Sequence, residues 1–175
     1  MTAPGWRLSG KPKVNDEWST PRSFFDMLNR EFAFALDAAC RSTNCLAPNG
    51  IMRDRGEDGL SAGWFARSRG GSVWCNPPYS ETGDWIRKCA DESAEGCVVV
   101  ALVPADVSTS WWRVIRDRAS EVRFVESRLT FGDHRSFKSR TPSAAVVFTP
   151  QGGPPTHSYI PAWRDATMPL PLATP

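Results

Sequence analysis

The chain has 175 residues, a length that suits one domain with a full hydrophobic core. Its formal net charge of +2 is a mildly basic balance, which permits nucleic-acid binding without requiring it. Because no apolar run approaches the length of a membrane span, we expect a cytosolic protein that does not enter a membrane.

The amino-terminal part is predicted to contain a flexible segment and then a helix. Residues 1–15 are polar, contain proline and glycine, and show no hydrophobic periodicity, so we expect them to be flexible. Thr20 and Pro21 have the residue types of a helix N-cap and a first helical position. Apolar residues follow at helical spacing, which predicts an amphipathic helix over residues 21–31.

A strand and an irregular region should come next. Residues 33–39 contain a short apolar run, and the strand predicted there should end at Asp37. Residues 41–71 are rich in glycine, asparagine, arginine and serine, so we expect only short elements among them. The next strand is predicted at residues 72–76, and a helix at residues 82–94 should point its apolar side chains inward.

The second half of the sequence alternates strands with a helix. Residues 97–103 are nearly all apolar, as in a central strand covered on both faces, and Pro104 ends the run. A helix is predicted at residues 108–119, and strands are predicted at residues 121–126 and 144–148. Because no strong helix separates the last two strands, we expect them to form an antiparallel hairpin at the sheet edge.

This alternation predicts an α/β fold with a doubly wound, mostly parallel sheet and an antiparallel edge strand. We assign the folded domain to residues 16–149 and a proline-rich tail, disordered or loosely attached, to residues 150–175. In such sheets ligands bind at the carboxyl ends of the strands. Asp37, Asn76 and Asp106 stand at the ends of three apolar strands, so their side chains should share one edge.

The cysteines give no sign of a metal site. Their number is odd, and no two of them have the CxxC spacing of paired zinc ligands. The two histidines, His134 and His157, lie far from them in the sequence. We therefore expect reduced, mostly buried thiols and no bound metal. The cysteines are Cys40, Cys45, Cys75, Cys89 and Cys97.

The most informative motif is Asn76-Pro77-Pro78-Tyr79, directly after a predicted strand. Two consecutive prolines lack N–H donors and end the strand, which leaves nearby backbone carbonyls available as acceptors. The Asn76 side chain supplies another acceptor. Two acceptors beside an aromatic ring suit a planar amine, either on a nucleobase or in an amide. A strand that happens to end in a proline turn is the alternative explanation.

The motif and other segments resemble the phage-type DNA N6-adenine methyltransferases, a small Dam-like family of bacteriophages and prophages. The resemblance runs from about residue 16 to residue 148, most of the predicted domain. Apart from Asn-Pro-Pro-Tyr no segment is decisive, but their order and spacing together are specific. The segments are residues 16–21, 36–39, 58–60, 74–80, 102–105, 111–112 and 128–131.

The resemblance implies a Rossmann-like class I methyltransferase fold, S-adenosylmethionine as methyl donor and adenine in DNA as acceptor. A phage or prophage protein would act in the cytoplasm of its bacterial host. The catalytic residues implied are Asn76, Pro77, Pro78 and Tyr79. The Asn76 side chain and the Pro77 carbonyl would accept the amine hydrogens and stabilise positive charge on nitrogen during one in-line transfer. Tyr79 would stack on a flipped base; an aromatic ring packed on the core is the alternative.

The cofactor residues that the resemblance implies come from several segments. Asp37 would accept hydrogen bonds from the cofactor, and a plain turn residue is the alternative. Many methyltransferases have a glycine-rich loop at this point, but here alanines follow Asp37. A generic Asp-Gly turn is the alternative for Asp58 and Gly59. The implied residues are Trp18, Thr20, Pro21, Asp37, Ala38, Ala39, Asp58, Gly59, Leu60 and Asn76.

DNA contact is predicted for the basic segment of residues 128–140. Its basic residues outnumber its acids, and two phenylalanines interleave with them, which suits phosphate contact. An ordinary solvated loop is the alternative. Of the adjacent tryptophans 111 and 112, one should face the core and the other the rim or the substrate. The predicted DNA-binding residues are Arg128, Arg135, Lys138, Arg140 and Trp112.

Two other functions fit the same residues. The acceptor could be adenine in RNA or a glutamine amide in protein, since both present a planar NH2 group. A nucleic-acid-binding relative without catalysis is the remaining alternative, and the intact Asn-Pro-Pro-Tyr motif argues against it.

Overall fold

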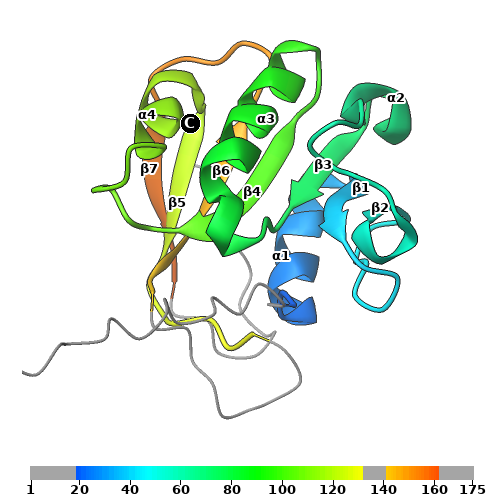
Figure 1. Cartoon of the computed structure of the whole chain (residues 1–175). Coiled ribbons are helices and arrows are strands. Elements are labelled where there is room, and N and C mark those ends of the chain that lie inside the picture. The colour runs from blue at the N-terminus through cyan, green and yellow to red at the C-terminus, as the bar shows by residue number, and fades with distance from the viewer. Residues whose placement is uncertain (1–18, 132–140, 162–175) are drawn as a thin grey trace, which may run out of the picture.

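The computed structural model describes residues 19–131 and 141–161, which form a seven-stranded sheet with helices on both faces (Figure 1). The strand order is β2-β1-β3-β4-β6-β5-β7. The helices are α1 (Arg22–Phe32), α2 (Trp64–Ser68), α3 (Thr82–Ala94) and α4 (Trp112–Arg118), with the short 3-10 helices η1 (Arg53–Arg55) and η2 (Tyr79–Glu81). The strands are β1 (Phe34–Cys40), β2 (Asn49–Met52), β3 (Ser72–Cys75), β4 (Val99–Pro104), β5 (Glu121–Val125), β6 (Ser143–Phe148) and β7 (Thr156–Ile160).

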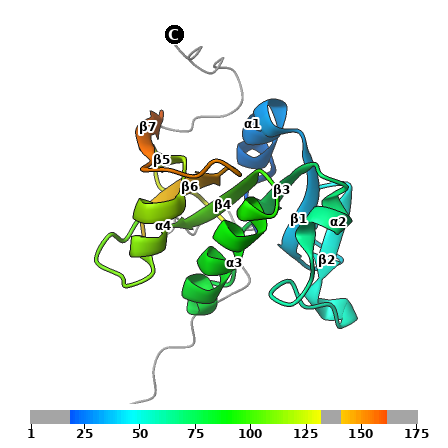
Figure 2. The same cartoon turned by 90° about the horizontal axis from the view of Figure 1, so that it is seen from above.

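The predicted α/β class with a mostly parallel sheet is confirmed. Paired strands run parallel except at β6, which is antiparallel to both β4 and β5. Helix α1 lies on one face of the sheet, and α3 and α4 lie on the other (Figure 2). Strand β4 is buried along nearly its whole length because both faces are covered. No helix within the described ranges has the length and apolarity to cross a membrane.

Helix α1 begins one residue later than predicted, and Thr20 does not cap it. Pro21 occupies the N-cap position, and its carbonyl accepts hydrogen bonds from the amides of Phe24 and Phe25 at 3.0 and 3.1 Å. The helix has no side-chain cap, because Thr20 lies one position too early for its hydroxyl to reach the first free amides. The Thr20 hydroxyl therefore does not bond to the amides at the start of the helix. Residues 1–15, predicted to be flexible, lie outside the described residues.

Strand β1 continues past its predicted end at Asp37. It reaches Cys40 because β2 pairs with it on the outer side, with Cys40 opposite Met52. The pairing shifts register between Asp37 and Cys40, as at a β-bulge. Asp37 therefore lies within the strand instead of ending it, and its side chain is buried.

The predicted antiparallel hairpin forms, but it does not lie at the sheet edge. Strands β5 and β6 pair antiparallel, and β6 inserts between β4 and β5. The edge strand on this side of the sheet is β7, which pairs in parallel with β5 over its whole length. The domain boundary predicted between residues 149 and 150 is therefore wrong, because β7 belongs to the sheet. Its Ile160 is buried in the core while its other side chains are largely exposed.

Helix α4 is shorter than the predicted helix at residues 108–119. The Asp106 side chain accepts hydrogen bonds from the Ser108 amide and hydroxyl at 3.1 and 2.6 Å. The Thr109 hydroxyl donates to the Asp106 carbonyl at 2.8 Å. These local bonds satisfy the backbone in a turn, so the helix begins only at Trp112.

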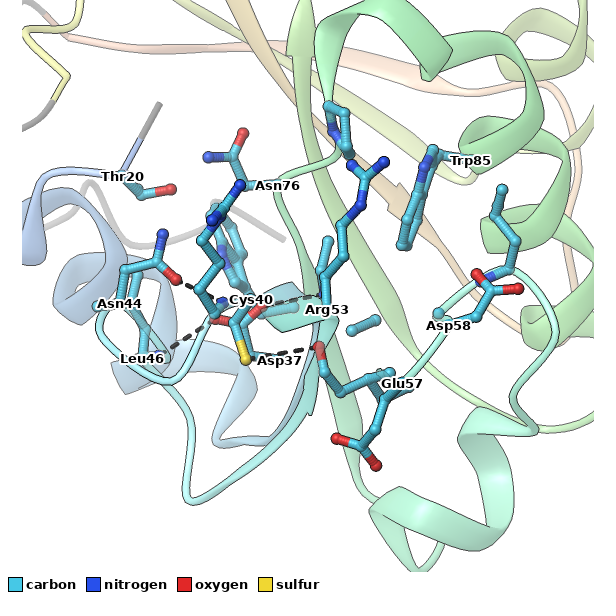
Figure 3. Close-up of a pocket in the computed structure, with 18 of the residues that line it drawn as sticks. Thr20, Asp37, Cys40, Asn44, Leu46, Arg53, Glu57, Asp58, Asn76 and Trp85 are labelled. Atoms are coloured by element: carbon cyan, nitrogen blue, oxygen red, sulfur yellow. Dashed lines mark hydrogen bonds between the residues drawn. The ribbon is translucent and has the colours of Figure 1, made fainter. Parts of the chain in front are cut away.

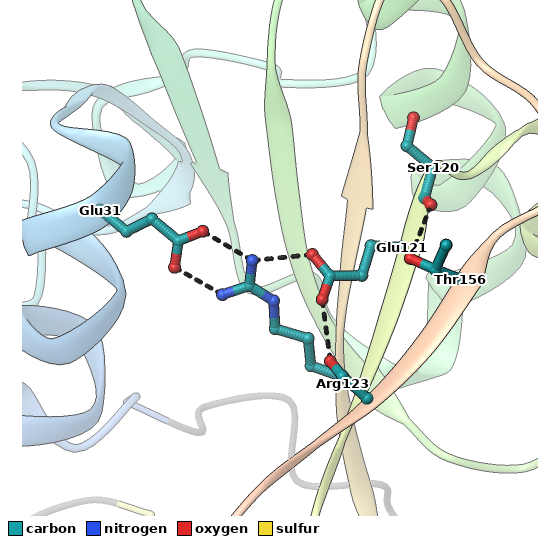
Figure 4. A network of polar contacts seen from close by, with 6 residues as sticks. Glu31, Ser120, Glu121, Arg123 and Thr156 are labelled. Atoms are coloured by element: carbon teal, nitrogen blue, oxygen red, sulfur yellow. Dashed lines mark hydrogen bonds and ion pairs between the residues drawn. The ribbon is translucent and has the colours of Figure 1, made fainter. Parts of the chain in front are cut away.

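One half-buried arginine, Arg123, ties α1 to the far part of the sheet (Figure 4). Arg123 of β5 donates two hydrogen bonds of 2.6 Å to the Glu31 carboxylate and one of 2.7 Å to Glu121. Its guanidinium also lies 5.2 Å from the centre of the Phe32 ring. These contacts join the end of α1 to a strand about 90 residues later in the chain.

Candidate active site

A cavity of about 350 Å³ opens at the carboxyl ends of β1, β2 and β3 (Figure 3). The parallel pairing of β1 with β3 explains why residues that are distant in the sequence line this cavity. Asp37 of β1 lies opposite Trp74 of β3, so Asn76, two residues beyond Trp74, reaches the same edge. The predicted cofactor residues that line the cavity are Thr20, Asp37, Ala38, Ala39, Asp58, Gly59, Leu60 and Asn76. Pro21 is not part of the lining, and Trp18 lies outside the described residues.

Asp37 provides a buried carboxyl group at the base of this cavity. It accepts hydrogen bonds from the backbone amides of Leu46, at 3.1 Å, and Ala39, at 3.3 Å. Burial raises the pKa of Asp37 from 3.8 to about 7, and the two backbone hydrogen bonds oppose that rise. A cationic ligand beside this carboxyl would favour its ionised form.

Thr20 supplies a second polar group to the cavity. Its side chain is 7% exposed, and its hydroxyl has no hydrogen-bond partner among the described residues. Figure 3 shows the hydroxyl on the side that faces the cavity, across from Asn76. A buried hydroxyl without a partner is costly, so its orientation suits a ligand that hydrogen-bonds there.

The turn at residues 58–60 forms one wall of the cavity and packs on α3. The Asp58 carboxylate accepts a hydrogen bond from the Leu60 amide at 3.0 Å, which holds the pKa of Asp58 below its usual value. The Gly59 carbonyl accepts from the indole N–H of Trp64 at 2.8 Å. Trp85 of α3 also lines the cavity and is 5% exposed. Asp58 therefore stabilises the turn and also lines the cavity.

The Asn-Pro-Pro-Tyr motif lies at the rim between the cavity and the opposite core. Asn76 and Pro78 line the cavity, whereas Pro77 is buried and Tyr79 is half-buried on the other side. The Tyr79 ring meets the Phe131 ring edge-on, with centroids 6.2 Å apart at 87°. Burial raises the pKa of the Tyr79 hydroxyl above its ordinary value. The motif thus lies directly after β3, with one end facing the cavity.

The structure describes only part of the predicted DNA-binding set. Arg128 is exposed, and the segment that follows it is anchored by the buried side chains of Leu129 and Phe131. Trp112 is half-buried and stacks on Phe124 at 6.5 Å and 16°, and Trp111 is also half-buried against the core. The expected division into one core and one rim tryptophan is therefore wrong. Arg135, Lys138 and Arg140 lie outside the described residues.

Several lining residues had no role in the sequence prediction. Arg53 follows β2 and lies 3.9 Å from the Glu81 carboxylate, across the cavity mouth. Glu57 is held by the Met52 amide at 2.8 Å and by the Arg67 guanidinium at 2.5 Å. Both belong to a region without hydrophobic periodicity, so the sequence carried no signal for them. Trp85 was predicted to face inward, but its place at the cavity required the packing of α3.

Comparison of the sequence with known proteins matches it to a family. The sequence profile described as DNA N-6-adenine-methyltransferase (Dam) matches residues 9–152. A DNA N-6-adenine-methyltransferase of Escherichia phage T1 is 30% identical over 118 residues, which cover 67% of this chain and 48% of that protein. A DNA N-6-adenine-methyltransferase of Haemophilus phage HP1 is 27% identical over 160 residues, covering 86% of this chain and 89% of that protein.

The chain therefore spans about half the length of the T1 relative and most of the HP1 relative. Among solved structures, a predicted O-methyltransferase from Agrobacterium tumefaciens aligns over 65% of this chain and 52% of that one, with 12% identity and a TM-score of 0.37. That likeness is too distant to bear on function. The profile match covers more than half of the chain, and on that ground the chain belongs to the DNA N-6-adenine-methyltransferase (Dam) family.

Proposed function

We propose that this protein methylates the N6 amine of adenine in DNA and uses S-adenosylmethionine as the methyl donor. The observation that carries the proposal is that Asp37, within β1, and Asn76, directly after β3, line one cavity. The Asp37 carboxyl suits a cationic cofactor, and the Asn76 side-chain oxygen suits the hydrogens of an amine. Membership in the DNA N-6-adenine-methyltransferase family supports adenine in DNA as the acceptor.

The cavity residues fit the proposed cofactor. When bound, S-adenosylmethionine supplies an electrophilic methyl group on a sulfonium. The buried Asp37 carboxyl would hold the cofactor's ammonium group or its ribose hydroxyls. The Thr20 hydroxyl, which has no partner in the described part of the chain, would bond to the same ligand. Leu60 and Trp85 offer apolar surface for the adenosine ring.

The remaining cofactor assignments follow from the same walls. Ala38 and Ala39 would let the cofactor approach the backbone closely, since their side chains are small. Asp58 and Gly59 would border the adenosine. The assignments of Trp18 and Pro21 rest on the family resemblance alone, because Pro21 does not line the cavity and Trp18 lies outside the described residues.

Acceptor activation is assigned to the Asn-Pro-Pro-Tyr motif. The Pro78 carbonyl already accepts a hydrogen bond from the Glu81 amide at 3.0 Å, so we assign the amine to the Pro77 carbonyl and the Asn76 side-chain oxygen. These acceptors would stabilise the positive charge that develops on nitrogen as it becomes tetrahedral. The edge-on contact with Phe131 would fix the Tyr79 ring so that it can stack on the flipped base.

DNA binding is assigned to the basic segment at residues 128–140 together with Trp112. The exposed Arg128 follows directly from the folded core, and Leu129 and Phe131 anchor the start of the segment. Cationic side chains there would contact phosphates and orient the duplex. Arg135, Lys138 and Arg140 retain this predicted role.

The proposal is tested with S-adenosylmethionine that carries a tritiated methyl group. The full chain is incubated separately with unmethylated duplex DNA, with RNA and with protein rich in glutamine. We expect label in DNA alone, recovered as N6-methyladenine after digestion to nucleosides. Label in RNA or protein only would contradict DNA as the acceptor. Donor binding without transfer to any of the three would favour a non-catalytic relative.

A further inference from the structure

Three potential metal ligands converge at the base of the cavity. One carboxylate oxygen of Asp37 and the sulfur atoms of Cys40 and Cys45 all lie within 4.8 Å of one another. Asp37 and Cys40 belong to β1, and Cys45 belongs to the loop that connects β1 to β2. Asp37 and Cys40 are buried, while Cys45 is half-buried. The cluster therefore lies in the interior of the protein, and solvent reaches it at Cys45.

The bulge in β1 explains how these side chains meet. Residues three apart on a regular strand point to opposite faces of the sheet. The register of β1 against β2 shifts between Asp37 and Cys40, which turns both side chains toward the same point. The connecting loop then returns Cys45 to this point. The sequence spacing of the two cysteines did not reveal the cluster, because the third ligand comes from a bulged strand.

Gly50 provides the space that the two sulfur atoms occupy. A Cβ atom added at Gly50 would lie 2.5 Å from the Cys40 sulfur and closer still to the Cys45 sulfur. Real Cβ contacts are essentially never this short, so a side chain at this position would displace the thiols. The backbone of β2 thus forms one wall of the cluster and leaves the sulfur atoms facing each other and Asp37.

The neighbouring groups leave the ligands available and orient them. The Asp37 oxygens accept one backbone hydrogen bond each, from Leu46 and from Ala39, and a carboxylate oxygen has a second lone-pair direction. Such hydrogen bonds are typical of carboxylates that bind metals. The thiols make long contacts with backbone carbonyls, Cys40 with Ile51 at 3.7 Å and Cys45 with Ala47 and Asn49 at 3.8 Å, and the two thiols also contact each other.

We propose that Asp37, Cys40 and Cys45 bind one thiophilic divalent cation, with Zn²⁺ the best match. Two thiolates and a carboxylate suit a tetrahedral site, in which the fourth position faces the cavity. Hard cations such as Mg²⁺ and Ca²⁺ prefer oxygen ligands and would bind poorly. Asp37 and Cys40 also line the proposed cofactor cavity, so the cation would compete with S-adenosylmethionine. This competition rests on the proposed function, whereas the binding of metal does not.

The test is a titration of the reduced full-length protein with Co²⁺ after treatment with a chelator. Thiolate-bound Co²⁺ gives a charge-transfer absorption band, and we expect one equivalent per chain, displaced by Zn²⁺ and not by Mg²⁺. Cys40→Ser and Cys45→Ser should each lower Zn²⁺ affinity by at least about 10-fold, since each removes a direct ligand. Cys97→Ala, which removes a buried thiol elsewhere, should bind as the unmodified chain does.

Alkylation of the unmodified chain tests the site even if a variant fails to fold. We expect Zn²⁺ to protect Cys45 from iodoacetamide, as mapped by mass spectrometry. The absence of the absorption band, or a band that survives both serine substitutions, would overturn the proposal. So would equal alkylation of Cys45 with and without Zn²⁺. None of these results depends on methyl transfer, so a failure here is distinct from a failure of the proposed function.

Discussion

Gly59 lies directly against the indole ring of Trp85. A Cβ atom added at Gly59 would lie 2.5 Å from Cη2 of that ring and closer still to the Ala38 carbonyl oxygen. The turn at residues 58–60, the end of β1 and helix α3 therefore meet at one glycine on the cavity wall. The Ala38 carbonyl belongs to the backbone and the Trp85 ring is buried, so neither can move aside easily.

We expect Gly59→Ala to weaken binding of S-adenosylmethionine by roughly 10-fold or more. The added methyl group must push the turn or Trp85 into the cavity, and overpacking of this kind typically costs about 1–3 kcal/mol. Isothermal titration calorimetry with the donor measures the effect. Gly63→Ala is the matched control, since a Cβ atom there meets nothing within 4 Å. Equal donor affinity in the two variants would remove Gly59 from the cofactor wall.

Replacement of Asn76 by alanine should abolish most methyl transfer and leave donor binding largely intact. Loss of one preorganised transition-state acceptor typically lowers kcat by about 100- to 1000-fold. Single-turnover transfer of tritiated methyl to duplex DNA, beside calorimetry with the donor alone, separates the two effects. Asn49→Ala removes an exposed asparagine from β2 and serves as the control. If Asn76→Ala lost donor binding and transfer to the same extent, Asn76 would serve the cofactor or the fold.

Arg123→Lys should lower the free energy of unfolding although it keeps the positive charge. Lysine cannot bind both oxygens of Glu31 while also reaching Glu121, and hydrogen bonds between charged groups contribute about 1.5–3 kcal/mol each. Urea denaturation measures the loss. Arg116→Lys is the control, because Arg116 pairs with Asp117 at the surface, where its side chain is 66% exposed. Equal stability of the two variants would mean that the Arg123 contacts do not hold α1 to β5.

Joint replacement of Arg128, Arg135 and Lys138 by glutamine should weaken DNA binding and flatten its salt dependence. Each lost phosphate contact reduces the slope of log K against log salt by about 0.9 for duplex DNA. Fluorescence anisotropy at several salt concentrations measures both quantities. A control with Arg30, Arg87 and Arg116 replaced by glutamine removes the same charge from exposed positions on the helices. If both triple variants lost the same affinity, overall charge and not the basic segment would govern binding.

Local sequence patterns predicted the elements whose residues specify their own conformation. The spacing of Phe24, Phe25 and Leu28 predicted α1, and these side chains are almost fully buried in the structure. The continuous apolar run at residues 97–103 predicted the central strand β4. Helical periodicity and unbroken hydrophobicity are read over a few neighbouring residues, so no knowledge of the fold was needed. The Asn-Pro-Pro-Tyr motif was equally readable, because two prolines end a strand wherever it lies.

Pairing between distant segments decided the rest. Strand β7 has few apolar residues, and only its pairing with β5 makes it part of the sheet. Thr20 has the residue type of a helix cap, yet Pro21 takes that position and Thr20 faces the cavity. The bulge that brings Asp37 and Cys40 together exists only because β2 pairs with β1.

The sequence by itself thus determined the chemical groups, the order of the main elements and the family resemblance. The tertiary structure decided which of those groups share a cavity. The physical reason is that side-chain chemistry and periodicity are local properties of the chain. Strand register and burial, in contrast, are set by contacts between segments such as β1 and β3, which are separated by about 30 residues. Asp37 and Asn76 become neighbours only through that register.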